Sequence, residues 1–295
     1  MGTVVSMQVV GHGTSQRARR ERTFGIDRAV AWFARIEAVC SRFDAQSELR
    51  QLSTRVGRSV PVSPLLFEAV QFALAVADET QGAFDPTVGH RMEARGFNIE
   101  YRTGDVVQSH IDAPTDTSYR DVELDARART ITLHRPLLLD LGAIAKGLAV
   151  DMASRELTPF VNFAIDAGGD LFLGGHNSDS VDWTVGIRHP RDATQIFETL
   201  RVSNHAVCTS GDYARHLLGV PTTHHIMQPL TGASTTAVAS VTVIATSAMI
   251  ADAFATAAFV LGPIDGLALL QRHELRGMMV TPTLERIATT GFERV

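Results

Sequence analysis

The sequence predicts an α+β fold, in which mixed sheets pack against helices. Apolar residues make up 45% of the 295 positions and charged residues 20%, which is enough to close a sizeable core and excludes a disordered chain. Strand-like and helix-like segments are mixed without a strict βαβ alternation, which favours α+β over a doubly wound sheet. The net charge of −5 provides no broad basic surface, so we expect no nucleic-acid partner.

The first part of the chain predicts one strand and two helices. Residues 3–10 have the pattern of a strand. Apolar residues at helical spacing predict a helix over 26–42, and the arginine-rich stretch 17–22 before it is expected to be a solvated turn or a helix start. Ser63-Pro64 is a helix start signal, so we expect a second helix over 63–81.

The rest of the chain continues this mixed pattern. Residues 82–116 are expected to be irregular, and an alanine-rich helix is expected over 248–261. The other expected elements are a helix over 143–155, a strand–turn–strand unit over 162–188, and strands at 122–125, 130–133, near 209, 240–245, 278–283 and 286–290.

Residues 241–262 are long enough to cross a bilayer, and their only charge is Asp252. A carboxylate at the centre of a span costs roughly 2.5–3.5 kcal/mol, and β-branched residues give way to alanine within this segment. We therefore expect a buried strand and a buried helix, and no transmembrane segment. Because the chain begins with a strand pattern and not with a signal peptide, we expect a cytoplasmic protein, or a membrane-associated extracytoplasmic one if a leader is missing.

Asp252 and Thr256 form the first candidate site. On a helix they lie one turn apart on the same face, where a carboxylate and a hydroxyl offer hard oxygen ligands for Mg²⁺ or Ca²⁺. The alternative is that Thr256 bonds back to the carbonyl of Asp252 while Asp252 faces solvent. The apolar neighbours favour a metal, because a buried carboxylate is usually paired or bound to a cation.

Asp140 and Lys146 form the second candidate site. An apolar strand ends at Asp140, and small residues then let a ligand approach the backbone before a helix begins. Lys146 is the only lysine among 27 basic residues and sits in position to contact an anionic group. The alternative is an N-cap aspartate and a surface lysine.

Two further segments contain residues that could take part in chemistry. His224 and His225 precede a Pro/Gly turn, and because adjacent side chains point in different directions, one of them is a candidate general base or a structural histidine. The turn over 166–170 has the glycines of a phosphate cradle, but Gly-Gly between two strands is also typical of a hairpin.

Eight blocks occur in order along the chain. They are Met1-Gly2-Thr3, Ser41-Arg-Phe-Asp44 with Ser47-Glu48-Leu49, Gly82-Ala-Phe-Asp-Pro-Thr-Val-Gly89, Asp140-Leu-Gly-Ala-Ile-Ala-Lys-Gly147, Ala167-Gly-Gly-Asp170, Thr209-Ser-Gly-Asp-Tyr213, His225-Ile-Met-Gln-Pro-Leu-Thr-Gly232 and Ala251-Asp-Ala-Phe-Ala-Thr256. This series resembles the ApbE family of FAD:protein FMN transferases over nearly the whole chain.

The resemblance implies one domain over residues 1–295, built from two closely packed subdomains with a T-fold-like core. It implies FAD as substrate, Mg²⁺ as cofactor, and an acceptor protein whose Thr or Ser hydroxyl receives FMN while AMP leaves. It implies His225 as the base and, for the metal, Asp252, Thr256 and the backbone oxygen of Ala143. The implied flavin contacts are Met1, Ala83, Phe84, Asp85, Asp140, Lys146 and Ile226.

The chain departs from the family pattern at two positions near the implied site. Gln228 stands where the family usually has an aspartate before the proline, and Phe43 stands where many members have tyrosine. Two alternatives to the transferase remain: an FAD pyrophosphatase that gives FMN and AMP, and a flavin-binding protein without chemistry.

Overall fold

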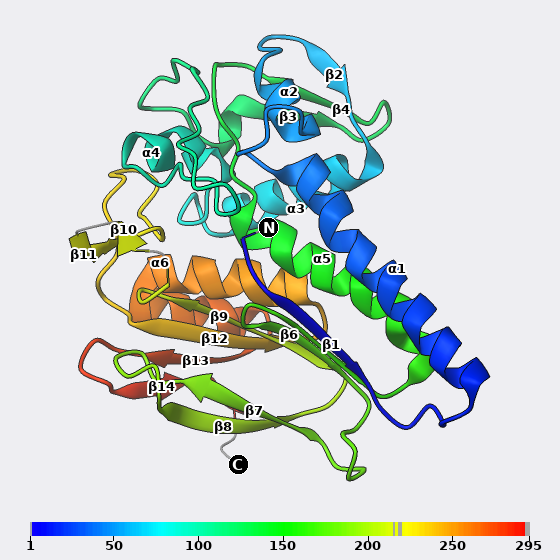
Figure 1. Cartoon of the computed structure of the whole chain (residues 1–295). Helices are drawn as coiled ribbons and strands as arrows, with labels where there is room; N and C mark the ends of the chain where they lie inside the picture. Colours follow the sequence, from blue (N-terminus) through cyan, green and yellow to red (C-terminus); the bar gives the residue numbers. More distant parts are fainter. Residues whose placement is uncertain (1, 215, 218–219, 293–295) are drawn as a thin grey trace.

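The structure is a computed structural model that describes residues 2–214, 216–217 and 220–292 (Figure 1). It confirms the α+β fold class, with helices packed on an antiparallel sheet of seven strands. In spatial order the strands of this sheet are β1 (Val5–Val9), β5 (Phe163–Ala167), β6 (Asp170–Gly174), β9 (His205–Gly211), β12 (Ser240–Ala245), β13 (Arg276–Val280) and β14 (Arg286–Ala288).

Helices α5 and α6 cover one face of this sheet, and α1 contacts its edge strand β1 (Figure 1). The helices are α1 (Gln16–Cys40), α2 (Glu48–Ser53), α3 (Pro64–Glu79), α4 (Gly89–Ala94), α5 (Gly142–Leu157) and α6 (Ala248–Arg272), with 3₁₀ turns η1 (Pro86–Val88), η2 (Tyr119–Asp121) and η3 (Thr158–Phe160). The main core lies between these helices and the sheet, because every residue of β12 is buried and α6 packs directly on it through small alanines.

A hairpin covers the other face of the sheet. It consists of β7 (Trp183–Arg188) and β8 (Ile196–Val202), and β7 alternates between buried and exposed residues along its length. Its apolar side chains, such as Trp183 and Leu200, pack with Val207 and Met278 of the sheet into a second hydrophobic cluster. Sheet residues therefore contribute to hydrophobic clusters on both sides.

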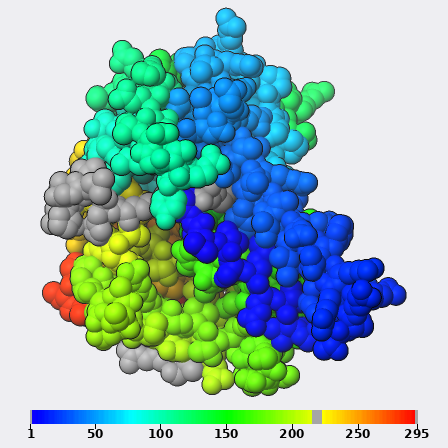
Figure 2. Space-filling model, viewed as in Figure 1, coloured from blue at the N-terminus to red at the C-terminus, as the bar shows by residue number. Residues whose placement is uncertain are grey.

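Smaller elements complete the fold around the helix ends. A three-stranded antiparallel sheet has the order β2 (Ser59–Pro61), β4 (Thr130–Leu133) and β3 (Val122–Asp125). A short ribbon pairs β10 (His216–Leu217) with β11 (Val220–His224). The space-filling view shows the surface hollowed between the blue-to-cyan part of the chain and the yellow-green part (Figure 2).

Helix α6 is apolar enough to cross a membrane by length and composition. Within the described residues it is the one helix that meets this test, with a mean hydropathy of 1.8 over its most apolar window, 56% of which is buried. A buried core helix meets the same test, and α6 packs against α5, β9 and β12. Its sequence pattern is therefore accounted for by its place in the core.

The structure corrects the predicted extent of two helices. Helix α1 begins at Gln16 and not at residue 26, so the arginine-rich stretch forms its first turns, capped by the Ser15 hydroxyl that accepts from Ala18 N at 3.1 Å. Helix α6 extends beyond 261 to Arg272. Gly262 (φ 81°) interrupts the helical backbone, and Pro263 then starts a second helical segment. A Gly-Pro pair is a local signal for the end of a helix, so the sequence analysis ends this helix too early.

Short elements within expected loops are the other differences. The segment expected to be irregular over 82–116 contains η1 and α4, and α2, β2 and β8 are additional elements that the sequence analysis does not predict. α2, α4 and β2 have six residues or fewer, too short to give a clear periodic pattern. β8 has seven residues and is a strand that the sequence analysis misses. Helices α3 and α5 and the strands at 122–125, 130–133 and 240–245 lie where they are expected.

The contact between α5 and α6 depends on Gly147. A Cβ atom placed there would lie 2.5 Å from the carbonyl oxygen of Ala248 and 2.6 Å from Cα of Met249. We expect Gly147→Ala to force the two helices apart and to lower the free energy of unfolding by about 1–3 kcal/mol, measured by urea denaturation. Arg155→Ala, an exposed change on the same helix, should alter it by less than about 0.5 kcal/mol. Equal urea midpoints for the two variants would contradict this.

Candidate functional site

Asp151 on α5 holds the first turn of α6 in place. Its carboxylate accepts hydrogen bonds from the Ser247 hydroxyl at 2.6 Å and from the backbone N–H groups of Ala248 at 2.6 Å and Met249 at 3.0 Å. These N–H groups have no partner within the helix, and a negative charge at a helix N-terminus is favourable. Because Asp252 follows one turn later, this contact fixes where the Asp252 carboxylate lies relative to α5.

A cavity of about 230 Å³ lies where α5 and α6 meet the 83–88 segment and the ends of β9 and β11. It brings together every implied site residue within the described part of the chain. These are Ala83, Phe84, Asp85, Asp140, Ala143, Lys146, His225, Ile226, Asp252 and Thr256. Met1, an implied flavin contact, lies outside the described residues.

Lys146 forms an ion pair with Asp170 at the start of β6, and its Nζ also lies 4.0 Å from Oδ2 of Asp252. Asp170 is only 1% exposed and Asp252 only 6%. A buried carboxylate is stable as an ion only when it is paired or hydrogen-bonded, and Lys146 supplies this charge to both. The alternative in which Lys146 is a surface residue is therefore wrong.

Asp252 and Thr256 lie on the face of α6 that borders the cavity. Because Asp252 is buried, the alternative in which it faces solvent is also wrong. The Thr256 hydroxyl lies 3.0 Å from the Ser210 hydroxyl at the end of β9. One carboxylate and two hydroxyls thus meet at the boundary between helix and sheet, and all are hard oxygen donors.

The donor set fits a magnesium ion that also binds substrate oxygens. Among the residues that the structure describes, no three His, Cys, Asp or Glu side chains are grouped as a complete metal site. Mg²⁺ usually takes one or two carboxylates and completes its six ligands with water and phosphate oxygens. Asp252, Thr256 and the backbone of Ala143, which all border the cavity, match that requirement.

Asp140 is held by Arg42 and by the start of α5. Its carboxylate forms an ion pair with the Arg42 guanidinium and accepts from the Gly142 N–H at 2.7 Å. The N-cap of α5 is Leu141, so the alternative in which Asp140 is the N-cap is wrong. Arg42 is 6% exposed, also donates to the Phe97 carbonyl, and lies 4.1 Å from the centre of the Phe43 ring. Arg42 therefore joins the 41–44 segment to the cavity wall.

Asp85 organises the 83–88 turn. Its Oδ1 accepts from both the N–H and the hydroxyl of Thr87, at 2.8 and 2.7 Å, and its Oδ2 accepts from Tyr119 N–H at 3.1 Å. Burial raises the pKa of this carboxyl above its usual range, although these hydrogen bonds oppose the shift. The same turn presents Ala83 and Phe84 to the cavity.

The structure separates the two adjacent histidines. His224 is 3% exposed, its Nε2 lies 2.8 Å from the Thr235 carbonyl, and its ring packs edge-on against Phe259 at 5.7 Å. His225 points the other way and lines the cavity. His224 is therefore the structural histidine, and His225 is the candidate base.

The glycine-rich turn over 166–170 is a β-hairpin, as the simpler interpretation predicts. Gly168 and Gly169 have φ of 65° and 95°, and the Asp166 carboxylate accepts from Gly169 N–H at 2.9 Å. The turn nevertheless borders the cavity through Gly168, against which the Thr3 side chain packs. The hairpin also begins β6 at Asp170, which places the Lys146 partner.

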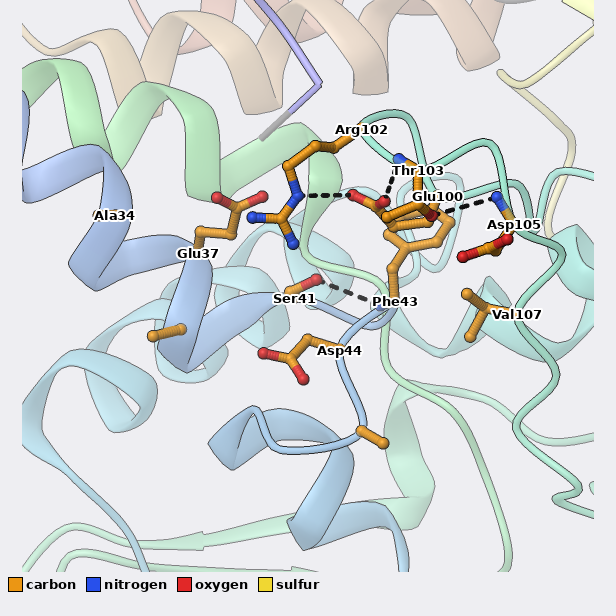
Figure 3. Close-up of a pocket in the computed structure, with 12 residues that line it drawn as sticks. Ala34, Glu37, Ser41, Phe43, Asp44, Glu100, Arg102, Thr103, Asp105 and Val107 are labelled. Atoms are coloured by element: carbon orange, nitrogen blue, oxygen red, sulfur yellow. Dashed lines mark hydrogen bonds and ion pairs between the residues drawn. The ribbon is translucent and has the colours of Figure 1, made fainter.

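A second and larger cavity, about 450 Å³, adjoins the 41–45 and 100–107 segments (Figure 3). Four carboxylates and one guanidinium line it: Glu37, Asp44, Glu100, Asp105 and Arg102. Phe43 borders both cavities, but no implied site residue lies in the larger one. The smaller cavity is the candidate site because it gathers the oxygen donors, the lysine and the histidine.

Four residues around the site are missed by the sequence analysis as functional positions: Arg42, Asp151, Asp170 and Ser210. Arg42, Asp170 and Ser210 stand inside the motif blocks, so the blocks themselves give the signal that they matter. Asp151 has no such signal, because it lies in the middle of a helix and its partners are about a hundred residues away in sequence.

The fold and the cavity define an enzyme site on an α+β scaffold, with carboxylates, hydroxyls, a lysine and a histidine around one pocket. The model of the ApbE family matches residues 1–279, and the chain belongs to this family. Among curated relatives, the FAD:protein FMN transferase of Vibrio cholerae is 31% identical over 265 residues, covering 86% of this chain and 79% of the relative. That of Treponema pallidum is 31% identical over 292 residues, covering 92% and 79%.

Solved structures of the family have the same fold. The ApbE protein from Thermotoga maritima superposes with a TM-score of 0.82 at 27% identity, covering 98% of each chain. The flavin transferase ApbE from Vibrio cholerae gives a TM-score of 0.81 at 28% identity, covering 99% of this chain and 95% of that one. The chain is therefore an enzyme of the transferase class.

The buried Asp151 carboxyl makes stability depend on pH. Burial raises its pKa, so the native state holds this proton more tightly than the unfolded chain does. Its contribution to stability is full below the unfolded pKa of about 3.9 and is lost as pH rises through the higher native pKa. Relative to Asp151→Asn, wild type should therefore lose unfolding free energy as pH rises above the unfolded pKa, measured by urea denaturation. A difference that does not change with pH would contradict this.

Proposed function

We propose that this enzyme transfers FMN from FAD to a Thr or Ser hydroxyl of an acceptor protein and releases AMP, with Mg²⁺ as cofactor. The names of the relatives support flavin transfer as the general activity. The observation that carries the proposal is that every implied site residue in the described chain lines one cavity. The proposal adds three features to this general activity: a Thr or Ser hydroxyl as acceptor, Mg²⁺ as the cation, and the release of AMP.

The start of α5 is suited to bind the pyrophosphate of FAD. Gly142 and Ala143 border the cavity at the N-terminus of a 16-residue helix, where the helix dipole favours an anion. The Gly142 N–H already donates to Asp140, so the helix dipole and not this N–H supports the proposal. Lys146, one turn further along, adds a positive charge on the same side. Without these groups, the carboxylates of Asp140 and Asp252 would repel a doubly charged pyrophosphate.

Asp252, Thr256 and the Ala143 carbonyl would hold Mg²⁺. The ion, when bound, would neutralise the pyrophosphate and stabilise the charge that develops on the departing AMP. The protein supplies a rigid helix for the carboxylate and a hydroxyl already oriented by Ser210.

His225, which lines the cavity, would act as the general base. In the proposed step the acceptor hydroxyl oxygen attacks the phosphorus of the FMN half, and its proton passes to the imidazole of His225. The bond between that phosphorus and the bridging oxygen breaks, and AMP leaves with the electron pair. The new bond is a phosphodiester between the acceptor side chain and FMN.

Hydrolysis is the alternative outcome of the same chemistry, with water in place of the acceptor hydroxyl. Gln228 leaves this alternative open, because the family usually has an aspartate at this position. In this structure Gln228 closes a tight turn through its backbone, donating to the Ala233 carbonyl and accepting from Gly232 N–H, both at 2.8 Å. The side chain is therefore not needed to form the turn.

The transfer itself is tested with FAD, Mg²⁺ and an acceptor domain already shown to be flavinylated by a family member. We expect a mass gain of one FMN on the acceptor and one AMP for each transfer. His225→Gln should lower the rate by about 10²–10⁴-fold, whereas His224→Gln should lower stability but keep turnover per folded molecule. AMP release without any acceptor would favour the pyrophosphatase, and flavin binding with no AMP would exclude both reactions.

Asp252→Asn tests the cation site. We expect the metal-free melting temperature to stay within a few degrees of wild type, because Lys146 keeps its ion pair with Asp170. Mg²⁺ binding, followed by calorimetric titration, should be lost, because an amide oxygen is a poorer ligand than a carboxylate. If Asp252 were instead a structural charge, its removal would lower stability by about 3–5 kcal/mol and leave the Mg²⁺ response unchanged.

A further inference from the structure

Asp170 is a buried carboxylate that the proposed chemistry does not use. It is 1% exposed, it begins β6 directly after the Gly168-Gly169 turn, and it forms an ion pair with Lys146. Its register partner in the hairpin is Ala167. The hairpin therefore fixes the position of this carboxylate through backbone hydrogen bonds, independently of the helices.

The Lys146 ammonium lies between two buried carboxylates, at unequal distances from them. It contacts Asp170 directly, whereas its Nζ lies 4.0 Å from Oδ2 of Asp252. The energy of an ion pair falls with distance, so the geometry assigns most of the lysine charge to Asp170. If Asp170 were neutral, the nearest carboxylate to the flexible lysine side chain would be Asp252, within reach of a small rotation about its side-chain bonds.

We propose that Asp170 is a positioning residue, which holds the Lys146 ammonium so that it does not close a full ion pair with Asp252. This inference rests on the proposed function and deepens it. Lys146 then supports the buried Asp252 carboxylate from 4.0 Å while no cation is present. The same restraint keeps the ammonium at the cavity wall, where it can contact a phosphate.

The first test is a double-variant cycle on the full chain, without metal. In Asp170→Asn and in Asp252→Asn the lysine keeps one carboxylate, but in the double variant it keeps neither. The decrease in melting temperature of the double variant should therefore exceed the sum of the decreases in the two single variants. The matched control pairs Asp252→Asn with Glu198→Gln, which breaks a buried pair with Arg286 (Nε–Oε2 2.6 Å) away from the cavity, and this cycle should be additive.

The second test measures binding of Mn²⁺, a probe for the Mg²⁺ site, by electron paramagnetic resonance of the FAD-loaded chain. Asp170→Asn should weaken Mn²⁺ binding about tenfold, as expected when a residue that orients a ligand is lost, and Asp170→Glu should restore part of it. Glu198→Gln should bind Mn²⁺ like wild type.

The two tests separate failure of this inference from failure of the proposed function. Wild-type Mn²⁺ affinity in Asp170→Asn, or an additive melting cycle, would overturn the role of Asp170. Absence of Mn²⁺ binding by wild type would instead overturn the metal step of the proposed function, and the melting cycle would then decide the role of Asp170 alone. If Asp170→Asn does not fold, the same comparisons are made with Asp170→Glu, which lengthens the side chain and should shift Mn²⁺ affinity in the same direction by a smaller amount.

Discussion

The close contact between α5 and α6 is the constraint on which the candidate site depends. Gly147 leaves no side chain between the two helices, and the Asp151 carboxylate takes up the first N–H groups of α6. Lys146 is the residue before Gly147, and Asp252 lies one turn after the capped end of α6. Because both side chains stand next to the helix contact, the 4.0 Å between them follows from how the helices pack.

The balance of charge around the cavity is acidic, and this has a consequence for any phosphate ligand. Arg42 is committed to Asp140 and Lys146 to Asp170, while Asp252 shares the lysine at a longer distance. A pyrophosphate entering such a site gains from the α5 N-terminus and from a cation, and loses from uncompensated carboxylates. Under the proposed function, a site of this composition would bind an anionic substrate better together with a metal than alone.

The end of β11 shows how one strand serves both stability and chemistry. His224 is the last residue of β11 and enters the core beside Phe259, whereas His225 lies in the bend that follows and lines the cavity. The contact between the His224 ring and the Thr235 carbonyl stabilises this part of the chain. The core histidine therefore contributes to stability, and the cavity histidine is the candidate base.

The sequence by itself determined the fold class, the central strands and helices α3 and α5, because periodicity and turn signals lie within a few neighbouring residues. The set of residues that meets in the cavity came from the resemblance of eight ordered blocks to the ApbE family. The start of α1 at Gln16 has a local signal, the Ser15 cap, which the sequence analysis did not use. The continuation of α6 past Gly262 was decided by packing that local signals do not report. The contacts of Arg42 with Asp140, 98 positions away, and of Asp151 with Ala248, 97 positions away, were likewise decided only by the tertiary structure. An ion pair or a cap between distant residues depends on distances of a few ångströms, and those distances exist only after the helices and the sheet have packed.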